Sequence, residues 1–180
     1  MKYGALWAAG ALALVLFGSV SYGQPATEEK IHGTWELSMS ISSTEASGQS
    51  GEPLPEGMEV EMAIAGEQTY RANGSYSSEA KINFQMRMPD GDMELNILVE
   101  EAGEWQLSED GRELTEVANE STYQPLDEPT KEILTALPEM GSMFEIEEGN
   151  TTTYQIIAIS DTEMEIQLEE PELRVVLNKQ

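Results

Sequence analysis

The side chains that could do chemistry in this chain are few. His32 is the only histidine among 180 residues and there is no cysteine. A Ser–His–Asp relay would therefore have to use His32, and neither a thiol nucleophile nor the usual zinc-ligand spacing is possible. We expect His32 at the rim of the fold, outside any catalytic site. Carboxylates are so abundant that a pair of them does not by itself indicate a glycosidase. We therefore expect no catalytic residues and no enzymatic activity.

Two other groups have the chemistry of metal ligands. The stretch 90–94 has the acidic spacing that opens a calcium loop, but the later bidentate glutamate is missing. Met86, Met88 and Met93 carry thioethers of the kind that bind Cu(I), yet no second histidine or Met-x-x-Met array accompanies them. An Asp-Gly pair also suits a turn, and methionine also fills apolar interiors. We therefore expect no metal and no cofactor.

These methionines lie in a stretch that predicts a β-hairpin. Between residues 81 and 100, apolar and polar side chains alternate on both sides of a Pro-Asp-Gly turn, which is the period of a strand. Cross-strand packing is best if Phe84 lies opposite Ile97 and Met86 opposite Leu95, whereas a shift by one residue would place apolar side chains against polar ones. The predicted register also forms two opposite-charge pairs: Arg87 with Glu94, and Lys81 with Glu100.

The same alternation recurs along most of the chain. The expected strands cover 34–41, 58–70, 75–88, 93–100, 105–107, 112–119, 152–159, 163–168 and 173–177. Asn73-Gly74, Asp110-Gly111, Asp161-Thr162 and Glu170-Pro171 supply turns between them. Short connections favour a meander, and closing a meander removes its exposed edges. We predict an all-β fold, a single antiparallel up-and-down β-barrel of about eight to nine strands.

One short helix is expected before the late strands. Asp127 can cap it, Pro129 fits its first turn and Pro138 ends it. Its apolar face comprises Ile133, Leu134 and Leu137. An apolar cluster within 140–144 follows in a loop.

The beginning of the chain has the pattern of an export signal. Lys2 precedes a short apolar run and a stretch of small residues, which predicts a signal peptide over 1–23. A single N-terminal membrane anchor is the alternative, although the apolar run is short for a span. We expect a flexible tail over 24–31, a barrel domain over 32–180 and no membrane insertion after cleavage. A secreted eukaryotic domain of this size usually has disulfides, whereas this chain has no cysteine. We therefore expect a bacterial periplasmic or extracellular protein.

The chain is strongly acidic. After removal of Lys2 with the signal it has 34 acidic and 8 basic residues, a net charge of 26 negative. That charge disfavours nucleic acid and anionic membranes as partners. The acids could attract a cationic partner or divalent ion, or form a solvated surface suited to saline surroundings. Their spread over outer strand positions favours the general surface. Examples are Glu59, Glu61, Glu163 and Glu165.

The first expected strand begins His-Gly-Thr-Trp at 32–35. This start resembles the Gly-x-Trp opening of lipocalins and of bacterial lipocalin-like domains, and the stretches 103–115 and 154–168 resemble hairpins of the bacterial group. The resemblance covers most of the mature chain and implies a small apolar ligand inside the barrel. It also implies that Gly33 and Trp35 close one barrel end, with Arg174 of the last strand packed across Trp35. The alternative is an outward Arg174 paired with a surface glutamate.

Two functions fit these features. The first is a secreted, non-enzymatic carrier or sensor that holds a small apolar molecule in the barrel. The expected ligand-binding residues are Met62, Phe84, Met86, Leu95 and Ile97. The second is a structural or protein-interaction module with a filled barrel, which would act through its acidic surface or the loop 42–55. An eight-stranded barrel can be filled by side chains or hold one small ligand, and the pattern does not define an oligomeric state.

Overall fold

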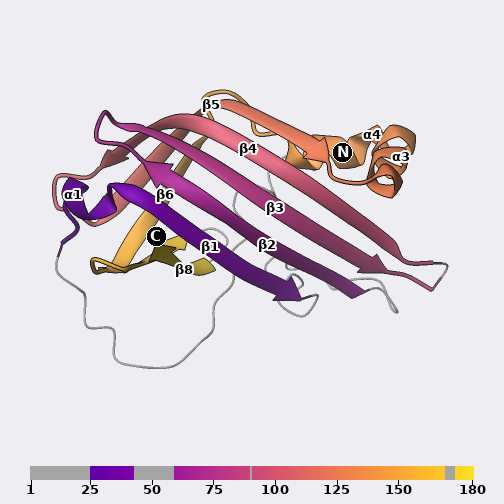
Figure 1. Cartoon of the computed structure of the whole chain (residues 1–180), viewed down its shortest axis with the longest axis horizontal. Helices are drawn as coiled ribbons and strands as arrows, with labels where there is room; N and C mark the ends of the chain where they lie inside the picture. The colour runs from indigo at the N-terminus through magenta and orange to yellow at the C-terminus, as the bar shows by residue number, and fades with distance from the viewer. Residues whose placement is uncertain (1–24, 43–58, 90, 169–172) are drawn as a thin grey trace.

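The protein folds into a closed barrel of eight antiparallel strands, each hydrogen-bonded to its neighbours in sequence, with the last strand beside the first (Figure 1). The computed structural model describes residues 25–42, 59–89, 91–168 and 173–180. The strands are β1 (Gly33–Ser42), β2 (Glu59–Tyr70), β3 (Ser75–Arg87), β4 (Met93–Leu107), β5 (Glu113–Pro125), β6 (Thr151–Ile159), β7 (Glu163–Leu168) and β8 (Leu173–Lys179). The predicted all-β, up-and-down barrel is confirmed.

Alternation of apolar and polar residues places one face of each strand inside the barrel. On β1, Trp35 and Ile41 are buried while Glu36 is exposed, and on β7 Met164 and Ile166 are buried. The buried side chains form two clusters. One includes Trp35, Tyr70, Tyr76, Trp105, Leu114 and Met164, and the other Ile41, Met62, Phe84, Leu95, Ile97 and Phe144.

The register of the β3–β4 hairpin differs from the prediction. Phe84 lies opposite Leu95 and Met86 opposite Met93, so the expected pairs of Phe84 with Ile97 and Met86 with Leu95 are wrong. The error is a shift of two residues, which leaves every side chain on its expected face. The facial pattern could therefore reject a one-residue shift but not this one.

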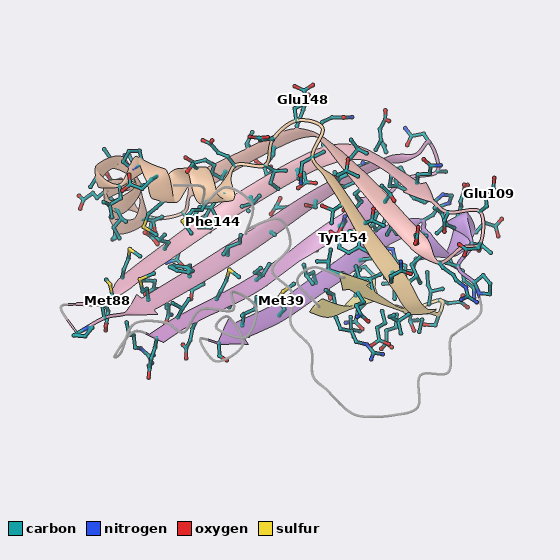
Figure 2. All side chains as sticks on the ribbon, turned by 180° about the vertical axis from the view of Figure 1, so that it is seen from behind. Met39, Met88, Glu109, Phe144, Glu148 and Tyr154 are labelled. Atoms are coloured by element: carbon teal, nitrogen blue, oxygen red, sulfur yellow. The ribbon has the colours of Figure 1, made fainter. Side chains whose placement is uncertain are left out.

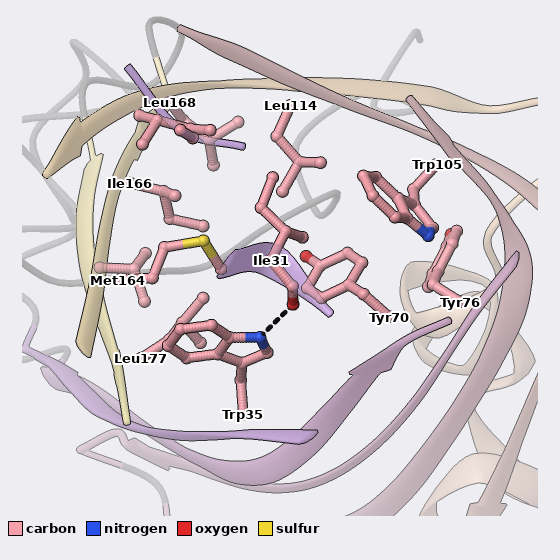
Figure 3. Close-up of a cluster of buried hydrophobic side chains, with 13 residues drawn as sticks. Ile31, Trp35, Tyr70, Tyr76, Trp105, Leu114, Met164, Ile166, Leu168 and Leu177 are labelled. Carbon is pink, nitrogen blue, oxygen red and sulfur yellow. Dashed lines mark hydrogen bonds between the residues drawn. The ribbon is translucent and has the colours of Figure 1, made fainter. Parts of the chain in front are cut away.

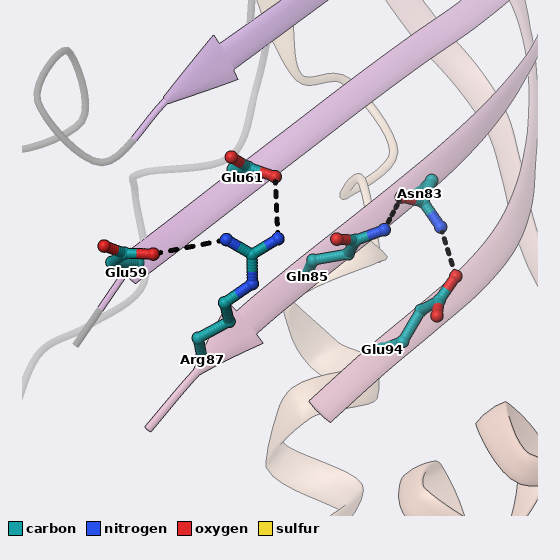
Figure 4. Close-up of polar contacts among 6 residues, drawn as sticks. All are labelled: Glu59, Glu61, Asn83, Gln85, Arg87 and Glu94. Carbon is teal, nitrogen blue, oxygen red and sulfur yellow. Dashed lines mark hydrogen bonds and ion pairs between the residues drawn. The ribbon is translucent and has the colours of Figure 1, made fainter. Parts of the chain in front are cut away.

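The two charge pairs predicted from that register are also wrong. The guanidinium of Arg87 lies 3.3 Å from a Glu59 carboxylate oxygen and 3.9 Å from one of Glu61, both on β2 (Figure 4). Lys81 lies opposite Leu98, not Glu100. Glu94 instead accepts a hydrogen bond from the Asn83 amide at 2.8 Å.

The break expected near Gly103 is only a bulge. β4 is one continuous strand whose pairing with β5 shifts between Ala102 and Gly103. A Cβ at Gly103 would collide with the Val117 backbone and the Tyr76 ring, so glycine is needed for this close approach. Beyond the bulge, Leu107 lies opposite Leu114.

Helices lie at both ends of the barrel (Figure 1). α1 (Glu28–Ile31) lies at one end; α3 (Glu128–Ala136), α4 (Pro138–Gly141) and the 3-10 turn η1 (Ser142–Phe144) lie at the other. The predicted cap is confirmed, because an Asp127 carboxylate oxygen accepts a hydrogen bond from the Thr130 N–H at 2.8 Å. Within the described residues, no helix has both the length and the apolar character needed to cross a membrane.

Residues 25–31 do not form the flexible tail that we expected. Ala26 and Ile31 are buried in the first cluster. The Ala26 N–H donates to the Gly111 carbonyl at 2.9 Å, and the Ile31 carbonyl accepts a hydrogen bond from the Trp35 indole at 2.7 Å (Figure 3). The apolar residues Ala26 and Ile31 thus make this segment part of the barrel core. Ser42, the first residue of the loop predicted over 42–55, ends β1. The rest of that loop, the predicted signal peptide over 1–23 and the turn at 170–171 lie outside the described residues.

Candidate functional site

The cation over Trp35 is Lys179, and the expected packing of Arg174 on this ring is wrong. The ammonium of Lys179 lies 4.9 Å from the Trp35 ring centroid. Gly33 has a φ of 129°, and a Cβ there would lie 2.7 Å from the Lys179 side chain. Gly33 therefore leaves the room that Lys179 needs beside Trp35.

Arg174 faces outward. On β8 it alternates with the buried Val175 and Leu177, so its side chain lies on the outer face. There its guanidinium pairs with the carboxylate of Glu165 on β7. The alternative of an outward arginine paired with a surface glutamate is therefore the observed one.

The five residues expected to bind ligand lie together in the second cluster. Met62, Phe84, Leu95 and Ile97 are buried, and Met86 is partly buried against them. They line the part of β2, β3 and β4 near α3, and the side chains packed against this face include Tyr123, Ile133, Leu134, Met140, Met143 and Phe144. Of the five, only Met62 lines the interior cavity described next. The other four mainly build one end of the core.

A cavity of about 190 Å³ lies in the barrel between the two clusters, and members of both line it. Its apolar wall includes Leu37, Met39, Met62, Val99, Phe144 and Leu177. Its polar wall includes Gln68, Glu101, Glu116, Asn150 and Tyr154. Met39, Phe144 and Tyr154 are marked in Figure 2, on β1, η1 and β6. The interior is therefore amphiphilic, not purely apolar as expected.

Glu116 is the centre of the polar wall. It follows Leu114 by two residues on β5, so the strand period turns it inward, where it is only 5% exposed. Its carboxylate accepts hydrogen bonds from the Gln68 amide at 2.7 Å and from the Tyr70 hydroxyl. Because two strands separate β2 from β5, these bonds cross the barrel interior.

The pKa of Glu116 is raised to about 7. Burial is the main cause of the rise and the charge of Glu101 adds to it, while the hydrogen bonds from Tyr70 and Gln68 act to lower this pKa. Near neutral pH this carboxyl group is therefore divided between its charged and neutral forms.

Glu101 is the second carboxyl group on this wall. It continues the inward face of β4 beyond Leu95, Ile97 and Val99, and it accepts a hydrogen bond from the Tyr76 hydroxyl. Burial also raises the pKa of Glu101, although the hydrogen bond from Tyr76 lowers it. Burial raises the pKa of Tyr76 as well, so Tyr76 stays a neutral donor.

Sequence reasoning missed both interior carboxyl groups, although the alternation contains the signal. Glu101 and Glu116 stand at the positions where the period of β4 and β5 requires inward side chains. Because glutamates are so numerous in this chain, their general spread predicts surface positions for all of them. An acid on an apolar strand face is the informative exception among many acids.

The remaining candidate groups lie elsewhere. The His32 ring packs edge-on against Trp105 with centroids 5.6 Å apart, at the end of α1 and not on the cavity wall. Met86 and Met93 face each other in the β3–β4 ladder and pack on the second cluster. No group of three or more histidine or acidic side chains placed to hold a metal occurs in the described part of the chain.

No protein-family model matches the chain, and a search of curated proteins finds no match to it.

Proposed function

We propose that this chain is an exported, non-enzymatic lipocalin-like barrel that binds a small, largely apolar molecule in its interior. The observation that carries the proposal is the cavity of about 190 Å³ between the two core clusters. A dry cavity of about 150 Å³ is large enough for benzene, whereas pockets for drug-sized ligands are about 300–1,000 Å³. The expected ligand is therefore about the size of a single ring with a short side chain.

Native mass spectrometry of protein purified from its own host tests this proposal. We expect a co-purified small molecule that is released on denaturation. A second arm titrates toluene into the purified protein and follows the methyl resonances of the cavity wall by NMR. Val99→Phe should fill the cavity and abolish toluene binding, because Val99 lines it. Val176→Phe is the matched control, since Val176 is exposed on β8.

Toluene binding that persists in Val99→Phe would place the ligand outside the cavity. If no ligand co-purifies and toluene does not bind, the protein is better explained as the filled, interacting module. The acidic surface would then be the first place to seek a partner. Glu109 and Glu148, for example, project away from the molecule (Figure 2).

Two parts of the proposal have separate tests. Export predicts that protein from the host starts at Gln24, so N-terminal sequencing that finds Met1 would reject signal cleavage. The absence of catalysis is supported by the position of His32 against Trp105, away from the cavity wall. A panel of hydrolase substrates should show no turnover, and activity that His32→Ala removes would contradict the proposal.

A further inference from the structure

The polar wall of the cavity makes the site selective by charge. Two carboxyl groups, Glu101 and Glu116, belong to its lining, and no lysine, arginine or histidine lines it among the residues that the structure describes. Lys179 is held by other groups: its ammonium lies over Trp35 and donates to the Lys30 carbonyl at 2.9 Å. The field inside the cavity is therefore negative, and an anionic ligand such as a fatty carboxylate would be repelled.

Hydrogen bonding leads to the same conclusion. Tyr70 and Gln68 already direct their donors to Glu116, and Tyr76 directs its hydroxyl to Glu101. The hydrogen-bonding capacity left on the carboxylates of Glu101 and Glu116 is acceptor capacity. A ligand group that binds between them must therefore bring hydrogen-bond donors.

Opposite this wall the cavity is apolar. Leu37, Met39, Met62 and Leu177 supply hydrocarbon and thioether surface that suits the body of a small molecule. The cavity thus matches a ligand with one donor-rich end and one apolar end, small enough for about 190 Å³.

We propose that the ligand of this barrel is a small protonated amine whose ammonium group binds between Glu101 and Glu116 and whose apolar body contacts the opposite wall. This inference rests on the proposed function and specifies its ligand class. An ammonium has three donors and a positive charge, and charge-assisted hydrogen bonds are about twice as strong as neutral ones. Inside a low-dielectric barrel this attraction is stronger than at the surface.

The titration of Glu116 supports the same ligand class. Burial raises the pKa of Glu116 to about 7, and a bound cation would lower it. The ammonium of an amine should therefore bind the ionised form of Glu116. Because this form becomes more populated at higher pH, amine affinity should increase as the pH rises through about 7. The titratable groups that face Glu116 are Tyr70, Tyr76, Glu101 and Tyr154. Burial raises the pKa of the three tyrosines, which therefore stay neutral in this range, and burial also raises the pKa of Glu101.

Three probes of nearly equal size separate charge from shape: phenethylammonium, 2-phenylethanol and phenylacetate. Isothermal titration calorimetry in about 0.5 M NaCl suppresses binding of the cation to the acidic exterior. We expect phenethylammonium to bind about tenfold to hundredfold more tightly than 2-phenylethanol, which is the usual difference between charged and neutral hydrogen bonds. Phenylacetate should not bind.

Matched variants locate the interaction. Glu116→Gln and Glu101→Gln keep the side-chain shape and remove the charge, so each should weaken phenethylammonium about tenfold or more and leave 2-phenylethanol nearly unchanged. Glu113→Gln is the control, because Glu113 is an exposed glutamate on the same strand. Circular dichroism checks that each variant folds. If one of the two carboxyl variants fails to fold, the other still tests the ammonium contact.

The outcomes separate this inference from the proposed function. Equal affinities for phenethylammonium and 2-phenylethanol would overturn the amine inference and leave a small-molecule barrel intact. Failure of all three probes to bind would count against both. Amine binding that neither Glu116→Gln nor Glu101→Gln weakens would place the cation on the outer surface and also overturn the inference.

Discussion

Lys179 and Trp35 form a cation–π contact where the last strand of the barrel meets the first. The ammonium lies 4.9 Å from the indole centroid and donates to the Lys30 carbonyl at 2.9 Å. Trp35 in turn donates from its indole nitrogen to the Ile31 carbonyl at 2.7 Å. The two side chains therefore tie β1, β8 and the segment around α1 into one unit.

Removing the charge of Lys179 should destabilise the protein. Lys179→Met keeps most of the aliphatic stem but loses the cation–π contact and the hydrogen bond to Lys30. We expect the free energy of unfolding to fall by about 1–3 kcal/mol, measured by urea denaturation. Lys81→Met is the control, because Lys81 is an exposed lysine on the outer face of β3. Equal losses in the two variants would contradict a specific role for Lys179.

Gly33→Ala should be costly for two separable reasons. Gly33 has a φ of 129°, which L-residues rarely adopt, and its added Cβ would lie 2.7 Å from the Lys179 side chain. We expect a loss of about 1–3 kcal/mol in the free energy of unfolding. Gly91→Ala measures the free-energy cost of the positive φ alone, because Gly91 has a φ of 143° and a Cβ there would have nothing within 4 Å. If both variants lose the same stability, the contact with Lys179 contributes nothing.

Glu116→Gln should change the pH dependence of stability. The pKa of Glu116 is about 7 in the folded protein and 4.5 as a reference for the unfolded chain, so the folded state holds this proton more tightly. The protonated form of Glu116 therefore stabilises the folded protein fully below about pH 4.5, and this stabilisation is lost as the pH rises through about 7. The difference between these pKa values corresponds to about 3 kcal/mol.

Relative to the wild type, Glu116→Gln should therefore gain stability as the pH rises from about 4.5 to about 7. Urea denaturation across this range measures the gain, which we expect to be about 1–3 kcal/mol. Glu113→Gln should show no such pH-dependent gain. A constant difference between Glu116→Gln and wild type would mean that Glu116 does not titrate in this window.

Salt should stabilise the protein. The chain has a net charge of 25 negative, and ion pairs such as Arg87 with Glu59 and Glu61 are exposed and contribute little. Screening of like charges improves up to about 0.5 M NaCl, so the melting temperature should climb over that range. A flat or falling curve would indicate acids already neutralised by a bound divalent ion, which a chelator would then reveal.

The strands and the helix could be predicted because each depends on neighbours in the sequence. Alternation locates β1, β2 and β3, and Asp127 with Pro129 locates the start of α3. The register of the β3–β4 hairpin could not be predicted this way, because a two-residue shift keeps Met86 and Phe84 on the same face. Only the length of the turn distinguishes those registers.

The barrel end shows a different limit. The predicted cation over Trp35, Arg174, is wrong, because the side chain that reaches this ring depends on the parity of β8 and on its register with β1, which place Lys179 there. Both are tertiary properties. Glu101 and Glu116, by contrast, were predictable from strand period alone once their neighbours were assigned to the core. The partners of Glu116, Tyr70 and Gln68, come from β2, two strands away from β5, and such cross-barrel contacts cannot be read from the local sequence.

The junction of β1 with β8 sets the order in which the barrel can assemble. This ladder joins only Trp35–Leu37 to Leu177–Lys179, whereas β2, β3 and β4 pair with adjacent strands along most of their lengths. Lys179 and the carbonyl it binds are 149 residues apart, so the entropy of a very long loop opposes this contact until the local hairpins exist. We expect closure to be the last step of folding. Lys179→Met should then accelerate unfolding and leave the refolding rate nearly unchanged, which stopped-flow kinetics can measure.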